Sequence, residues 1–107
     1  MSQKARIKLP DQAAPGEVIE VKALINHVME TGNRKDAEGK PIPRNIINTF
    51  TAKYAGTLVF EANFGSGIAA NPFIAFYMRV PGPGEFEMTW IDDRGETTVE
   101  RAALNVV

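Results

Sequence analysis

Residues 17–27, EVIEVKALINH, alternate between two faces and decide the fold class of this chain. One face is apolar up to a final histidine and carries Ile19, Val21, Ala23, Ile25 and His27. The other face mixes apolar and polar side chains and carries Val18, Glu20, Lys22, Leu24 and Asn26. A period of two with β-branched residues is typical of a strand that buries one face.

Further strand-like segments lie on both sides of this one, separated by turn-forming residues. They cover residues 7–9, 46–54, 57–64, 73–80, 85–92 and 96–107. Within residues 46–54, Ile46 falls on the same face as Phe50 and Tyr54, and Ile47 falls on the opposite face. With no helical period, the pattern predicts one all-β domain over residues 1–107, an immunoglobulin-like antiparallel β-sandwich of about seven strands. A small β-barrel is the competing architecture.

Residues 73–80 differ from the other segments because both of their faces are apolar. Phe73, Ala75 and Tyr77 share one face, and Ile74, Phe76, Met78 and Val80 share the other. Such a strand needs cover on both sides. The pattern predicts either a partner interface or a central strand beneath a long loop, and it does not separate the two.

A charged segment, METGNRKDAEGKPIPR, covers residues 29–44 and has no helical period. We expect a long exposed loop or hairpin arm, and structureless loops of this length usually have a function. Its three carboxylates, Glu30, Asp36 and Glu38, are interspersed with basic side chains. This favours a self-neutralising surface over an acid–base pair, which requires two carboxylates held at a fixed separation.

Composition excludes several classes of function. The chain has 107 residues, with 12 basic and 13 acidic side chains, a formal net charge of −1 and no cysteine. It has no basic cluster for nucleic acid or for a membrane surface, and no apolar run of about 20 residues for a membrane span. It supplies neither a thiolate metal site nor a cysteine nucleophile. The first six residues do not form a signal peptide.

His27 is the only histidine, so it is the one candidate for a general base or metal ligand. No second histidine or cysteine completes a metal site, which favours a buried histidine bonded to the backbone. Nothing supports a triad of Ser66 with this histidine. We therefore expect a binding or scaffold protein without a cofactor, rather than an enzyme.

Several motifs together resemble the SoxZ family over about residues 6–107. They are HVMETG at 27–32, RKD at 34–36, IPR at 42–44, ANPF at 70–73 and the late Trp90, Asp92, Asp93 and Gly95. Two positions depart from the family pattern. Val28 stands where many relatives have proline, and Ala69 replaces the more usual hydroxyl residue.

The resemblance implies a non-catalytic subunit of the SoxYZ sulfur carrier. In that family the partner SoxY holds sulfur intermediates on a cysteine during thiosulfate oxidation, and the two chains form an obligate heterodimer. The resemblance also implies a periplasmic location, reached by export with a signal-bearing SoxY, and transient contacts with other Sox enzymes. The alternative is a similar carrier that serves another redox enzyme, such as a quinoprotein dehydrogenase.

Two groups of residues are expected to carry these contacts. The apolar surface for SoxY is expected to contain Phe60, Phe64, Phe73, Phe76 and Met78. The loop that meets the Sox enzymes is expected to present His27, Met29, Glu30, Arg34 and Arg44.

Overall fold

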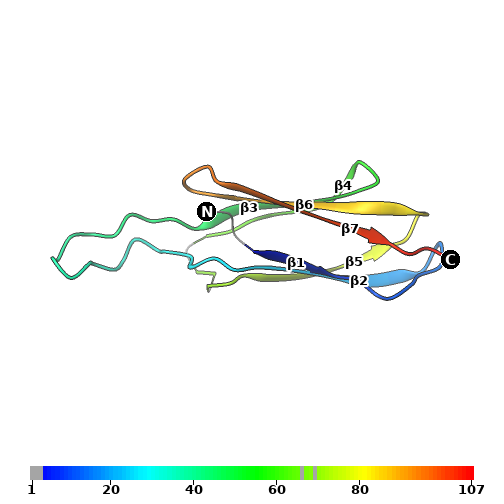
Figure 1. Ribbon diagram of the computed structural model, residues 1–107, viewed down its shortest axis with the longest axis horizontal. Coiled ribbons are helices and arrows are strands. Elements are labelled where there is room, and N and C mark those ends of the chain that lie inside the picture. Colours follow the sequence, from blue (N-terminus) through cyan, green and yellow to red (C-terminus); the bar gives the residue numbers. More distant parts are fainter. Residues whose placement is uncertain (1–3, 66, 69) are drawn as a thin grey trace.

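The computed structural model describes residues 4–65, 67–68 and 70–107. Seven strands form within these ranges: β1 (Ala5–Lys8), β2 (Val18–Ile25), β3 (Ile47–Tyr54), β4 (Thr57–Asn63), β5 (Phe73–Arg79), β6 (Gly84–Asp92) and β7 (Thr97–Leu104). They build two antiparallel sheets, of order β1-β2-β5 and β4-β3-β6-β7. Figure 1 shows the two layers facing each other. The predicted all-β sandwich is confirmed, and the described residues contain no helix.

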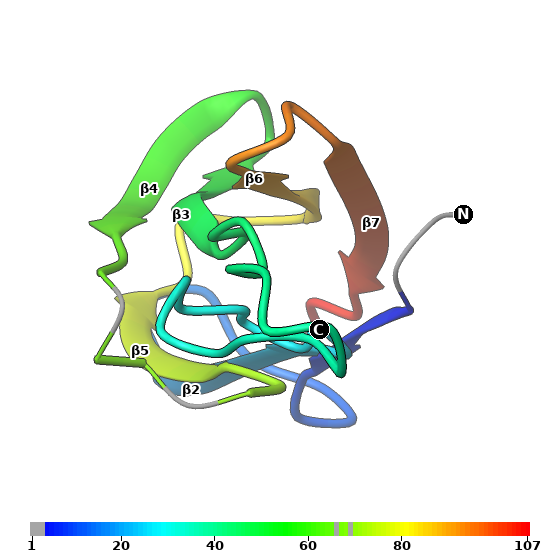
Figure 2. The same cartoon turned by 90° about the vertical axis from the view of Figure 1, so that its left-hand side faces the viewer.

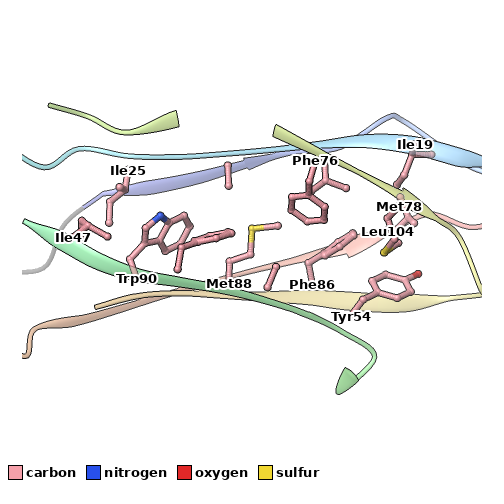
Figure 3. Packing of buried hydrophobic residues seen from close by; sticks show 14 of the residues in the cluster. Ile19, Ile25, Ile47, Tyr54, Phe76, Met78, Phe86, Met88, Trp90 and Leu104 are labelled. Carbon is pink, nitrogen blue, oxygen red and sulfur yellow. The ribbon is translucent and has the colours of Figure 1, made fainter. Parts of the chain in front are cut away.

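The core lies between the two layers and is built from the inward face of each long strand. From β2 it takes Ile19, Val21, Ala23 and Ile25, as the alternation predicts. From β6 it takes Phe86, Met88 and Trp90, all at most 1% exposed. Figure 3 shows Ile19 and Ile25 of β2 on the opposite side of this layer from Phe86, Met88 and Trp90 of β6. Burial of one large apolar side chain contributes about 1.5–3 kcal/mol, so this layer supplies most of the stability.

Strand β3 departs from the expected alternation at its start. Ile47 was predicted to face away from the core, yet Ile46 and Ile47 are both fully buried. The register between β3 and β6 shifts between Ile47 and Thr49. A bulge of this kind turns two successive side chains to one face, which an alternation rule cannot foresee.

Strand β5 lies at an edge of the three-stranded sheet, so the central-strand interpretation is wrong. Phe76 and Met78 point into the core and are 7% and 9% exposed. Their expected place on a partner surface is therefore wrong, because the sandwich itself buries them. The opposite face of β5 stays open, with Phe73 57% and Tyr77 71% exposed.

The two sides of the sandwich differ. On the side of β1 and β7, Ala13 bridges to Val106, and its backbone N–H donates to the carbonyl of Asn105 at 2.9 Å. On the other side, seen at the left of Figure 2, no backbone hydrogen bond joins β4 to β5 among the described residues. That side is closed by aromatic packing, in which Phe60 stacks on Phe76 with ring centroids 4.7 Å apart.

Gly84 offers a test of this packing. A Cβ at Gly84 would lie 2.8 Å from Cζ of Tyr54, whose buried ring is held by a 2.5 Å hydrogen bond from its hydroxyl to the carbonyl of Gly82. We expect Gly84→Ala to lower the free energy of unfolding by about 1–3 kcal/mol in urea titrations. Gly82→Ala is the matched control, because its Cβ would meet nothing within 4 Å. Equal free energies of unfolding for the two variants would show that a Cβ at Gly84 does not clash with Tyr54.

Candidate functional site

The end of β2 carries His27, which is 3% exposed. Its Nδ1 accepts a hydrogen bond from the backbone N–H of Met29 at 2.9 Å, and its Nε2 lies 3.4 Å from Oδ2 of Asp92. The acceptor role of Nδ1 places the single ring proton on Nε2. Both ring nitrogens are therefore engaged within the fold. The buried, backbone-bonded histidine is confirmed, and the expected place of His27 in an exposed docking loop is wrong.

Asn71 joins two motifs that lie far apart in the sequence. Its backbone N–H donates to the carbonyl of His27 at 2.7 Å, and its Oδ1 accepts from the N–H of His27 at 2.9 Å. Its φ is +54°, a left-handed conformation that asparagine tolerates better than most residues. The HVMETG and ANPF motifs thus meet at one point, at the base of the charged segment.

Met29 is also buried, at 4% exposure, so its expected place on an exposed docking loop is wrong. The backbone N–H of Ile47 lies 3.2 Å from its Sδ atom. Its φ of +52° turns the chain out of the sandwich directly after this side chain. The Met29 side chain therefore lies in the core and anchors the start of the charged segment, and it is not available to a partner.

Beyond Met29 the chain forms a hairpin arm over residues 30–45. Glu30 and Asn45 pair through both of their backbone groups, at 2.9 and 2.7 Å, and Lys35 bridges to Pro41. In Figure 1 this arm, drawn in cyan to green, extends past the end of both sheets. The molecule measures 58 × 22 × 20 Å along its principal axes. The prediction of an exposed arm is confirmed.

Arginine side chains of the arm form ion pairs at its base. Arg34 Nε donates to Glu30 Oε2 at 3.1 Å, and this hydrogen bond lowers the pKa of Glu30 below its ordinary value. Arg44 Nε donates to Oδ2 of Asp93 at 2.8 Å, which ties the arm to the turn between β6 and β7. The Asn48 side-chain amide and the Arg44 guanidinium lower the pKa of Asp93 by bonding its ionised form. Both arginine side chains are half-exposed or more.

A pocket of about 350 Å³ lies between the arm and that turn. Its lining joins five polar or charged residues to two apolar ones: His27, Glu30, Asn45, Arg94 and Glu96, with Val28 and Ile42. The buried Oδ1 of Asn45 has no hydrogen-bond partner among the described residues. The described part of the chain groups no three histidine, cysteine or acidic residues as a metal site would require. Ser66 lies outside the described residues.

The remaining predicted partner residues are divided between two places. Phe60 and Phe64 are partly buried beside the core, on the side where β4 and β5 face each other. Phe73 lies on the outward face of the β1-β2-β5 sheet. Sequence reasoning did not name Tyr77 as a partner residue, although the alternation of residues 73–79 puts it on the face of Phe73. Its exposure could have been inferred only by knowing which face of β5 turns inward.

Replacing Asn71 tests the junction of the two motifs. We expect Asn71→Ala to lower the free energy of unfolding by about 2 kcal/mol, because alanine loses the acceptor and tolerates the left-handed backbone poorly. Asn71→Asp keeps both properties and should stay near wild type in the same thermal and urea unfolding measurements. An Asn71→Ala variant as stable as wild type would show that these contacts of Asn71 contribute nothing to the stability of the fold.

The lowered pKa of Asp93 predicts a pH dependence. Ionised Asp93 stabilises the fold fully above the ordinary carboxyl pKa of about 4, and this stabilisation is lost as the pH falls through the lower folded value. We expect Asp93→Asn to cost about 1 kcal/mol at pH 7, with the gap to wild type closing below about pH 4. Asp11→Asn, at an exposed site, is the control for urea unfolding across this range. A gap independent of pH would contradict this role.

Comparison with solved structures places the fold among known sandwiches. The superoxide reductase (neelaredoxin) of Ignicoccus hospitalis is similar with a TM-score of 0.73 at 14% identity, covering 96% of this chain and 80% of that one. The sulfur carrier protein SoxY of Chlorobium limicola f. thiosulfatophilum is similar with a TM-score of 0.66 at 11% identity, covering 96% and 78%. At these identities the likeness shows the fold alone.

Sequence comparison identifies the family. No curated protein matches the chain. The family model for the sulphur oxidation protein SoxZ matches residues 7–103, which include the His27–Asn71 junction, the arm and all but the ends of the chain. The chain therefore belongs to the SoxZ family and is a sulfur-oxidation protein of the Sox pathway.

Proposed function

We propose that this chain is the non-catalytic scaffold subunit of a SoxYZ sulfur carrier, paired with SoxY in an obligate heterodimer. The observation that carries the proposal is the family match over residues 7–103, joined to an exposed aromatic surface on β5. SoxY would hold the sulfur intermediates of thiosulfate oxidation on its cysteine, and this chain would hold SoxY. The periplasmic location, reached by export with SoxY, belongs to the same proposal.

Chemistry supports a division of labour between the two chains. Covalent sulfur intermediates need a thiolate, and these 107 residues contain no cysteine. His27, the sole histidine, uses one ring nitrogen on a backbone N–H and directs the other at Asp92. A general base needs a free lone pair within reach of substrate, and this side chain offers none in its present contacts. The reacting groups are therefore assigned to the partner.

The exposed aromatic side chains support tight partner binding. Tyr77 and Phe73 are more than half exposed on an edge strand of a sandwich whose core is already filled. Stable complexes bury roughly 800 Å² on each partner, and tyrosine and arginine are prominent among the residues that dominate their binding energy. The outward face of β5 provides such side chains without any loss from the core.

The arm supports brief contacts with the Sox enzymes that act on the carried sulfur. It projects from the sandwich, is stiffened by its backbone bridges and presents Arg34 and Arg44 beside carboxylates. Mixed exposed charges give contacts that are screened by salt and easily reversed. Of the residues first expected here, Arg34 and Arg44 stay in this proposal as exposed contacts, and Glu30, whose side chain is 10% exposed, positions Arg34. The buried His27 and Met29 anchor the base of the arm.

Coexpression with the SoxY encoded in the same genome tests the proposal. We expect a 1:1 complex, or a multiple of it, by size-exclusion chromatography with light scattering, because the exposed aromatic surface needs cover. The control is the same chain coexpressed with an unrelated sandwich protein of similar size, which should elute separately. A monodisperse 11.7 kDa monomer in the presence of SoxY would remove the assigned function and leave the fold intact.

A further inference from the structure

We propose that the outward face of the β1-β2-β5 sheet is the surface that holds SoxY, and that SoxY places a carboxylate side chain between Lys8 and Lys22. This inference rests on the proposed function, since it names the contact surface and the chemistry of the partner's side. Three features of this face carry it: its aromatic side chains, its charge and a hollow between two lysines.

Two aromatic side chains, Phe73 and Tyr77, lie along the outward face of β5 with Ala75 between them, and we call this row of residues with Val18 and Leu24 the stripe. Register pairs Leu24 with Phe73 and Glu20 with Tyr77 on the outward face. Val18, at the end of the stripe, is 51% exposed. The outward positions of the β4-β3-β6-β7 sheet provide a comparison within the same molecule, because they carry threonines, charged side chains and scattered aliphatics but no aromatic ring. The β1-β2-β5 face is therefore the less suited of the two to permanent contact with water.

The same face is basic although the whole chain has a net charge of −1. Its outward positions hold Arg6, Lys8, Lys22 and Arg79 against one acid, Glu20. Arg79 is held in place by a 2.7 Å hydrogen bond from Nη1 to the carbonyl of Gly16. Charge complementarity therefore favours a partner whose facing surface is acidic.

Two of these lysines lie in an unfavourable arrangement. Lys8 and Lys22 are direct cross-strand partners, and like charges directly opposite each other destabilise a sheet. Lys22 has an exposed partner in Glu20 at 3.6 Å, whereas Lys8 makes no ion pair within the part of the chain that the structure describes. The repulsion is relieved if a partner supplies the missing negative charge.

A hollow lies at this point. It has a volume of about 250 Å³ and is lined by Lys8, Leu9, Pro10, Glu20 and Lys22. That space suits one or two side chains and is too small for a drug-sized ligand to be well enclosed. A carboxylate entering it would approach Lys8, which lacks an ion pair among the described residues, and Lys22, which already has Glu20 beside it. Apolar side chains of the partner would pack on the stripe beside the hollow. The hollow and the stripe share one sheet, so a single folded partner reaches both.

Competition for SoxY tests the surface even where the complex is very tight. SoxY is coexpressed in limiting amount with the wild-type chain and one variant, and the two bound chains are quantified by mass spectrometry. We expect Tyr77→Ala and Lys8→Glu each to be displaced about tenfold by wild type. The matched controls on the opposite sheet, Leu58→Ala and Lys53→Glu, should compete equally, since both sites are exposed. All four variants alter exposed residues, and unfolding curves verify that each remains folded.

The outcomes separate the inference from the proposed function. If all four variants compete equally with wild type, the β1-β2-β5 face is not the surface that binds SoxY. The proposed function still stands in that case, because the wild-type chain binds SoxY. Failure of wild type to bind SoxY would overturn the function and this inference together. Self-association of the isolated chain that is abolished by Tyr77→Ala, with SoxY binding unchanged, would assign the face to a second copy. The contact between a SoxY carboxylate and the two lysines predicts that the affinity of the wild-type complex falls between 50 and 500 mM salt, and that the affinity of the Lys8→Glu complex falls less.

Discussion

Burial of the inward faces of two small sheets against each other is the constraint on which the rest of this structure depends. The chain has 107 residues and no cysteine, so a single apolar layer replaces the disulfides that stabilise many small sandwiches. Each long strand commits one face to that layer, including Phe76 and Met78 of β5. Whatever the protein binds must therefore meet the outward faces, the edges or the ends of the sandwich.

At one end, the apolar layer gives way to a polar junction. A polar group buried without a partner costs about 1–3 kcal/mol, and the buried His27 and Asp92 satisfy each other and the adjoining backbone at the base of the arm. Asn71, at the surface, bonds the backbone of His27. Met29 adds an apolar anchor, and Asp93 draws Arg44 and Asn48 to the same point. A charged segment that would otherwise be a flexible loop is thereby held as a projecting hairpin. His27, which the sequence favours as a buried histidine, is part of this junction.

The fold itself does not identify the chemistry. Solved structures named as superoxide reductases and as the sulfur carrier protein SoxY share the sandwich with this chain at 10–14% identity, so function must be argued from the residues that each chain places on the fold. In this chain the distinguishing features lie on the surface: an exposed aromatic stripe, an excess of basic side chains on the same sheet and a stiffened arm at one end. These features support the proposed role of a chain that holds and presents a partner. They agree with membership of the SoxZ family.

The sequence by itself determined the strand segments, the inward face of β2 and the exposed arm. These follow from local periodicity and from backbone conformations that particular residues favour. Only the tertiary structure decided which apolar face of β5 turns inward, how a bulge buries both Ile46 and Ile47, and that His27 and Met29 lie beneath the arm. Only the tertiary structure shows that Lys8 and Lys22 are direct cross-strand partners. The physical reason is that alternation reports which side chains share a face, whereas burial and register depend on strands distant in the sequence that cover or pair with that face.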